Sequence, residues 1–230
     1  MKDIHSTRRS VLAVILAAPI VACSKVSKTD NPPAPPSPVP QRAPAASGGL
    51  IEIKADTAGI RLDLRYATTN NFTGRTLYNQ ARAFLQGVAA EALMRARDSA
   101  AKEGYGLTLF DAYRPWRVTK QLWDATPLSQ RNYVANPKRG SRHNRGCAVD
   151  LSLHALETGA QVEMPSAFDD FSERAHRDFM GASAEAIANR ARLARYMEAE
   201  GFIGMSNEWW HFDYHDWQAF PVLDLPFEDI

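Results

Sequence analysis

Two short motifs, far apart in the chain, carry residue types that could together bind a metal ion. The stretch SRHNRGCAVD, residues 141–150, places His143 and Asp150 on either side of a glycine, and the later stretch EWWH supplies Glu208 and His211. Two imidazoles and one carboxylate are a common ligand set for catalytic zinc, which keeps a fourth position for water. The motifs therefore predict one zinc ion per chain, bound by His143, Asp150 and His211.

The other charged residues near these motifs fit the hydrolysis of an amide bond. Glu208 would act as the base that takes a proton from the attacking water and passes it to the leaving amine. Zinc would lower the pKa of that water towards neutrality. Arg114, in the stretch DAYRP, could stabilise negative charge on the oxygen of the attacked carbonyl. A simpler interpretation joins Glu208 and Arg114 in an ion pair.

Two other nucleophiles are possible in the first motif. Ser141, His143 and Asp150 match the residue types of a serine hydrolase, but no glycine-flanked nucleophile elbow surrounds Ser141. Cys147 could act as a thiol nucleophile with a histidine. A cysteine at the start of a buried strand is more often an inert small hydrophobe. Both remain minor alternatives to a zinc hydrolase.

Hydrophobic periodicity predicts a strand for each motif. Val149, Leu151 and Leu153 alternate with polar residues, which predicts a strand with one face buried and Asp150 on the other. The second motif lies in an aromatic-rich strand predicted over residues 202–214. Strict alternation would place Glu208 and His211 on opposite faces of that strand. A turn or a bulge between them is therefore required if both side chains are to face the metal.

The elements around the motifs indicate an α+β fold. Alternation predicts a half-buried strand over 59–67, and a short apolar run predicts another over 107–110, with Arg114 at its end. Helical spacing predicts helices over 88–103, 118–125 and 184–200, with Gly104 and Gly201 as stops for the first and the last. Strands and helices alternate without a regular βαβ repeat. We therefore expect a single domain with a mainly antiparallel sheet and flanking helices.

Composition excludes some classes of partner. The chain has 230 residues, of which 45% are hydrophobic, and this is enough to form a core. A net charge of +1 gives no reason to expect nucleic acid as a partner, since that requires a concentrated basic face. No protein partner is inferred.

The first residues are typical of an export signal, which we place over residues 1–23. Lys2 and Arg8 precede an apolar run over 11–22, which is too short for a membrane-spanning helix. Both the twin-arginine and the general route remain open. Ile20 to Cys23 resembles a bacterial lipobox, in which the cysteine is acylated. The sequence thus predicts an exported lipoprotein of the cell envelope or periplasm, anchored in a membrane through Cys23.

A proline-rich segment separates this leader from the folded part. Residues 24–49 include NPPAPPSPVP, and such a composition cannot bury enough apolar surface to fold. We expect this segment to be a tether of extended chain. The catalytic domain would then occupy residues 50–230.

Five stretches resemble one known family, the D-alanyl-D-alanine dipeptidases associated with vancomycin resistance. They are DLRYATTNNFTG, DAYRP, GSRHNRGCAVDLSL, MPSAFDDFSE and NEWWH, and the resemblance covers nearly all of residues 57–214. It implies the α+β D,D-peptidase fold, which is related to the hedgehog signalling domain. It also implies the zinc ligands, base and arginine given above.

The resemblance extends to residues that would bind substrate. It implies that Asp169 and Tyr66 hold the ammonium group of the dipeptide and that Ser141 lies near its carboxylate. A buried carboxylate facing a substrate ammonium is a strong charge-assisted contact. Because such a contact restricts cleavage to peptides with a free N-terminus, it favours a dipeptidase over an endopeptidase.

Three features depart from the family pattern. The segment between Arg114 and His143 is shorter than in the resistance enzymes, which implies a more open pocket. Cys147 replaces a serine, which affects packing. The resistance enzymes work in the cytoplasm, whereas an exported enzyme would meet dipeptides released from peptidoglycan.

The sequence as a whole therefore predicts a membrane-anchored zinc dipeptidase that acts on D-alanyl-D-alanine or similar small D,D-dipeptides. A D,D-carboxypeptidase acting on muropeptides is the first alternative. A non-catalytic wall-binding lipoprotein is the second, and the presence of both Glu208 and Arg114 argues against it.

Overall fold

A five-stranded sheet organises the part of the chain that the structure describes, residues 49–230 of a computed structural model. The strands follow the order β2-β4-β5-β7-β6, and only the pair β2 and β4 is parallel. Their bounds are Ile60–Leu62 (β2), Tyr105–Asp111 (β4), Ala148–Ala155 (β5), Phe202–Met205 (β6) and Glu208–Tyr214 (β7). A separate antiparallel pair joins β1 (Leu50–Ile53) to β3 (Ala83–Gln86).

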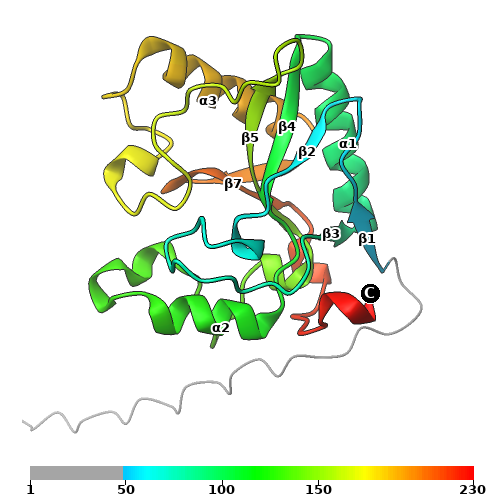
Figure 1. The fold of residues 1–230 in the computed structure, drawn as a ribbon, viewed down its shortest axis with the longest axis vertical. Coiled ribbons are helices and arrows are strands. Elements are labelled where there is room, and N and C mark those ends of the chain that lie inside the picture. Colours follow the sequence, from blue (N-terminus) through cyan, green and yellow to red (C-terminus); the bar gives the residue numbers. More distant parts are fainter. Residues whose placement is uncertain (1–48) are drawn as a thin grey trace, which may run out of the picture. The chain divides into compact units, whose positions relative to one another are not determined.

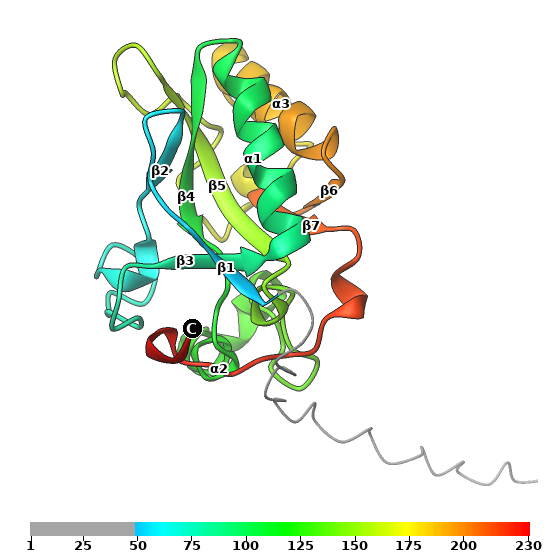
Figure 2. The same ribbon diagram turned by 90° about the vertical axis from the view of Figure 1, so that its right-hand side faces the viewer.

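Two of the three helices in this region cover the same face of the sheet. Helices α1 (Gly87–Ala101) and α3 (Ala184–Glu198) run beside each other there, whereas α2 (Trp116–Ala125) lies at the opposite end of the domain, as Figures 1 and 2 show. The inner side of α1 consists largely of alanines around the fully buried Leu93. Small side chains allow the helix to lie close to the sheet, and α3 adds Leu193 and Met197 to the same core.

The architecture confirms the predicted α+β domain with a mainly antiparallel sheet. The three predicted helices all form, with ends shifted by a few residues. Gly104 and Gly201 follow α1 and α3 with φ angles of 82° and 86°, a left-handed conformation that glycine adopts without steric cost. The segments predicted as strands around residues 107 and 149 become β4 and β5.

Three local predictions are wrong. Alternation over 59–67 predicted one strand, but β2 ends at Leu62 and the chain turns into a 3₁₀ helix, Arg65–Ala67, that buries Tyr66. Residues 202–214 form the hairpin of β6 and β7 rather than one strand. Strand β5 is buried on both faces over its first seven residues, because helices cover one side and the loops around the site cover the other.

The required irregularity in β7 is present, which confirms that prediction. Along β6, Gly204 pairs with Phe212 and the next residue, Met205, pairs with Glu208. The intervening residues of β7 bulge out of the ladder, which changes the alternation of its side chains. A smaller register shift lies between Leu109 and Asp111 of β4.

The leader and the tether predicted over 1–23 and 24–49, with the lipid anchor at Cys23, lie outside the described residues, apart from Gly49. Within residues 49–230, none of the helices combines the length and apolar character needed to cross a membrane. Strand β1 begins at Leu50.

Candidate metal centre and catalytic site

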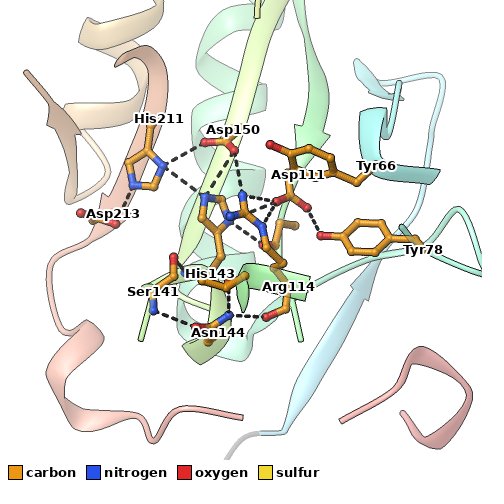
Figure 3. A network of polar contacts seen from close by, with 12 residues as sticks. Tyr66, Tyr78, Asp111, Arg114, Ser141, His143, Asn144, Asp150, His211 and Asp213 are labelled. Carbon is orange, nitrogen blue, oxygen red and sulfur yellow. Dashed lines mark hydrogen bonds and ion pairs between the residues drawn. The ribbon is translucent and has the colours of Figure 1, made fainter. Parts of the chain in front are cut away.

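Three elements bring the predicted zinc ligands together. His143 begins a 3₁₀ turn, His143–Arg145, just before β5, while Asp150 lies on β5 directly opposite His211 on β7. Figure 3 shows the three side chains converging. The Nε2 atom of His143 lies 3.2 Å from Nδ1 of His211 and 3.3 Å from Oδ2 of Asp150, and His211 Nδ1 lies 2.9 Å from Oδ1 of Asp150. All three residues are buried.

This donor set fits a zinc ion, because each imidazole directs one nitrogen into the cluster and binds a hydrogen-bond acceptor through the other. Nδ1 of His143 lies 2.7 Å from the carbonyl oxygen of Ala112, so it carries the ring proton and leaves the Nε2 lone pair for a metal. Nε2 of His211 lies 2.9 Å from Oδ1 of Asp213, which leaves Nδ1 free in the same way. Hydrogen bonds of this kind orient the imidazole ligands of metal sites.

The charge state of Asp150 also suits a ligand. Burial opposes ionisation of this carboxyl, but the facing imidazoles of His143 and His211 keep its pKa below the ordinary value. An ionised carboxylate therefore lies between two nitrogen donors. The ligand atoms all lie within 4.8 Å of one another.

Glu208 lies beside this cluster without belonging to it. Its Oε2 atom is 3.9 Å from Nδ1 of His211, because the bulge in β7 turns both side chains towards the same cavity. Burial raises the pKa of Glu208 to about 7. A carboxylate with a pKa near neutrality can both accept and return a proton at physiological pH.

Arg114 is held by an aspartate rather than by Glu208. It follows β4, and its Nε and Nη2 atoms lie 2.8 and 2.6 Å from Oδ2 of Asp111. The guanidinium also lies over the ring of Tyr66 and 3.7 Å from Oδ2 of Asp150. Within the described residues the simpler interpretation, an ion pair between Glu208 and Arg114, is therefore wrong.

The predicted substrate-binding residues border the same inner cavity, which has a volume of about 60 Å³ and is also lined by the ligands, Glu208 and Arg114. The hydroxyl of Tyr66 donates to Asp169, 3.1 Å from Oδ2. Asp169 is the one non-glycine residue with a positive φ, 59°, in the described part of the chain. Such strained backbone is common at functional sites. Ser141 also lines this cavity.

The structure speaks against both alternative nucleophiles. Burial raises the pKa of Cys147 to about 12, so this thiol stays protonated at neutral pH and cannot attack. The hydroxyl of Ser141 accepts from the backbone N–H of His143 at 3.2 Å. Nδ1 of His143 faces the carbonyl of Ala112 and Nε2 faces Asp150 and His211, so neither ring nitrogen is directed at the Ser141 hydroxyl as a base would have to be.

Sequence reasoning missed two carboxylates that support the site. Asp111 is fully buried, holds Arg114 and accepts a 2.6 Å hydrogen bond from the hydroxyl of Tyr78. Asp111 lies three residues before Arg114 at the end of a strand, and this short spacing could have predicted an ion pair between the two side chains. Asp213 holds His211 and lies two residues after it on β7, so strand alternation could have placed both on one face.

Comparisons with known proteins show which family this chain resembles. A family model described as D-ala-D-ala dipeptidase matches residues 46–228. A D-alanyl-D-alanine dipeptidase of Escherichia coli is 36% identical over 174 residues, which cover 76% of this chain and 89% of that protein. One of Enterococcus faecium is 40% identical over 188 residues, 73% of this chain and 93% of that protein.

Among solved structures, VanYB in complex with D-alanine-D-alanine is 19% identical and covers 60% of this chain and 75% of that chain, with a TM-score of 0.39. A VanY D,D-pentapeptidase variant in complex with Zn(II) is also 19% identical, covering 60% and 76%, with a TM-score of 0.37.

Proposed function

Because the chain belongs to the D-alanyl-D-alanine dipeptidase family of zinc metallopeptidases, we propose that it hydrolyses D-alanyl-D-alanine and related D,D-dipeptides to free amino acids, as an exported, lipid-anchored enzyme. One observation carries the catalytic part of this proposal. The ligand atoms of His143, Asp150 and His211 converge in a buried cluster directly beside Glu208.

In this proposal some residues of the chain bind the metal and others transfer a proton or stabilise charge. Zinc, when bound by His143, Asp150 and His211, supplies a Lewis acid and lowers the pKa of water. Glu208 takes the proton of the attacking water and delivers it to the leaving nitrogen. Arg114 faces the oxygen of the attacked carbonyl, where its fixed positive charge stabilises the tetrahedral state.

The dipeptide is held at both ends. Asp169, with Tyr66 beside it, receives the ammonium group, and Ser141 lies near the carboxylate. Burial and the negative charge of Asp150 raise the pKa of Asp169 well above its ordinary value. A substrate ammonium would offset both effects and ionise Asp169, so a peptide with a free N-terminus gains a charge-assisted contact that an acylated peptide lacks.

The location of the enzyme is proposed from its first residues. A charged start, an apolar run and the lipobox-like Ile20 to Cys23 favour export and acylation of Cys23, which would place the domain in the cell envelope or periplasm on a proline-rich tether. There the substrates would be dipeptides released from peptidoglycan.

The activity is tested by incubating the zinc-loaded protein with D-alanyl-D-alanine or with its N-acetyl derivative and measuring free D-alanine. We expect the free dipeptide to be cleaved at least about a hundredfold faster than the N-acetyl derivative, because the acetylated substrate leaves the buried Asp169 without a cationic partner. Cleavage of only the acetylated form would indicate a D,D-carboxypeptidase. Cleavage of neither would indicate a non-catalytic protein.

A further inference from the structure

A second, larger cavity opens beside the inner one and continues it. This outer cavity has a volume of about 540 Å³ and is bordered by the segment between α2 and His143, by Arg145 and by Trp217. It shares Ser141, Arg142, Met205, Glu208 and the stretch 133–135 with the inner cavity. The metal ligands, Tyr66, Arg114 and Asp169 border the inner cavity alone.

This arrangement gives the bound dipeptide a direction. If Asp169 receives the ammonium group, the amino-terminal residue occupies the inner cavity. Glu208 and Ser141, which border both cavities, lie at the boundary between them. The carboxyl-terminal residue therefore faces the outer cavity, which is far larger than the methyl side chain of alanine requires and falls in the size range of ligand pockets.

The outer cavity is strongly basic. Arg131, Arg139, Arg142 and Arg145 line it, and Glu208 at its boundary is the one carboxylate among its lining residues. Within residues 49–230, Arg142 has an ion-pair contact, 3.6 Å from Asp213, whereas the other three guanidinium groups have no carboxylate partner. A ligand carboxylate would offset the mutual repulsion of these positive charges.

Aromatic rings lie against three of these four guanidinium groups, those of Arg131, Arg142 and Arg145. Arg131 lies 4.6 Å above the ring of Trp123, and Arg142 and Arg145 lie 4.7 and 5.3 Å from the ring centre of Trp217. The Nε atoms of Arg131 and Arg142 are buried without a hydrogen-bond partner. Buried donors without partners are costly, and a carboxylate is the group that arginine binds best, through two parallel hydrogen bonds.

We propose that the outer cavity is a subsite for an acidic side chain, so that the enzyme prefers D,D-dipeptides whose carboxyl-terminal residue carries a second carboxylate. This inference rests on the proposed function and names the substrate class of the same site. An alternative occupant, the main-chain carboxylate that every dipeptide carries, would give no preference for an acidic residue.

The test compares D-Ala-D-Glu with its neutral isostere D-Ala-D-Gln, with D-Ala-D-Ala as reference, on the zinc-loaded full chain. We expect kcat/KM for D-Ala-D-Glu to exceed that for D-Ala-D-Gln about tenfold or more, and the ratio to fall as salt is added. Equal values, with D-Ala-D-Ala cleaved, overturn the subsite and leave the proposed function intact. Cleavage of none of the three overturns both.

Arginine variants test whether the outer cavity causes the preference for D-Ala-D-Glu. Arg139→Gln removes an exposed charge that makes no ion pair and should lower the ratio of D-Ala-D-Glu to D-Ala-D-Gln about threefold or more, and Arg131→Gln should do the same. The matched control is Arg75→Gln, an exposed arginine outside both cavities, which should leave the ratio unchanged. An unchanged ratio in both test variants would overturn the assignment of the outer cavity.

Discussion

At the scale of single residues, hydrogen bonds to neighbouring groups determine which nitrogen of each histidine can bind a metal. To bind a metal, His143 and His211 must each present an unprotonated nitrogen and carry the ring proton on the other nitrogen. The carbonyl of Ala112 and the carboxylate of Asp213 accept those ring protons. Asp111 plays the comparable part for Arg114. The chemistry of the site therefore depends on neighbours that touch neither metal nor substrate.

The role of Glu208 can be separated from that of the ligands by measuring zinc content and turnover together. Glu208→Gln keeps the shape of the side chain but removes the base, so we expect zinc to stay bound while kcat falls by about 10²–10⁴. His211→Ala should lose both zinc and activity. Glu157→Gln, an exposed glutamate far from the cavities, should change neither. Equal zinc loss in the Glu208 and His211 variants would make Glu208 a ligand.

At the scale of elements, two irregularities aim the side chains. The bulge in β7 lets Glu208 and His211 face one cavity although they are three residues apart on a strand. The 3₁₀ turn that holds His143 ends at Gly146, whose φ is 67°. The carbonyl of Gly146 accepts from the backbone N–H of Gln86 at 2.8 Å, so the turn is tied to the end of β3.

Replacing Gly146 by alanine should therefore destabilise the fold through two effects, the strain of a positive φ angle and steric contact with neighbouring residues. Gly146→Ala forces a side chain into the left-handed region and against Leu50 and the backbone nitrogen of Gln86. Gly74→Ala is the matched control, because Gly74 has a φ of 64° but open space around it. We expect the control to lose about 1 kcal/mol in the free energy of unfolding and Gly146→Ala about 1–2 kcal/mol more.

Urea titration of both variants, at the same zinc concentration, measures these losses. If the two glycine variants lose equal stability, the contacts around Gly146 are not tight, and the turn is held by backbone conformation alone.

At the scale of the whole molecule, we propose different roles for the two cysteines. Cys147 is buried and free, and its protonated thiol packs at the start of β5. Cys23 follows the apolar run of the proposed export signal. Acylation at Cys23 would tether the catalytic domain to a membrane, where the enzyme meets dipeptides without being lost from the envelope.

Membrane attachment is checked by fractionating cells that produce the full chain. Cys23→Ala should move the protein from the membrane to the soluble fraction and abolish the incorporation of labelled palmitate, because a single thiol would be the site of acylation. Cys147→Ala, which removes the other thiol, should remain in the membrane. Retention of Cys23→Ala in the membrane with its label would contradict lipidation at this residue.

Much of the site could be predicted from the sequence, because residue types and local periodicity determine which groups are available. Short motifs predict the ligand cluster that the structure brings together and the irregularity that β7 shows. The same motifs name Glu208 as the base and Arg114 as the stabilising cation, and these two roles stay predictions. Strand β2 was predicted too long, since alternation does not reveal where a chain leaves a sheet. The hairpin of β6 and β7 was missed because the aromatic residues continue through its turn.

Only the tertiary structure decided which groups meet across the chain. The contact of His143 with Ala112, the pairing of Tyr66 with Asp169, and the packing of Arg142 and Arg145 against Trp217 all join segments that are distant in sequence. No local pattern encodes such contacts. They arise because burial of the core docks β4, β5 and β7 side by side and leaves the loops at their ends to form the cavities.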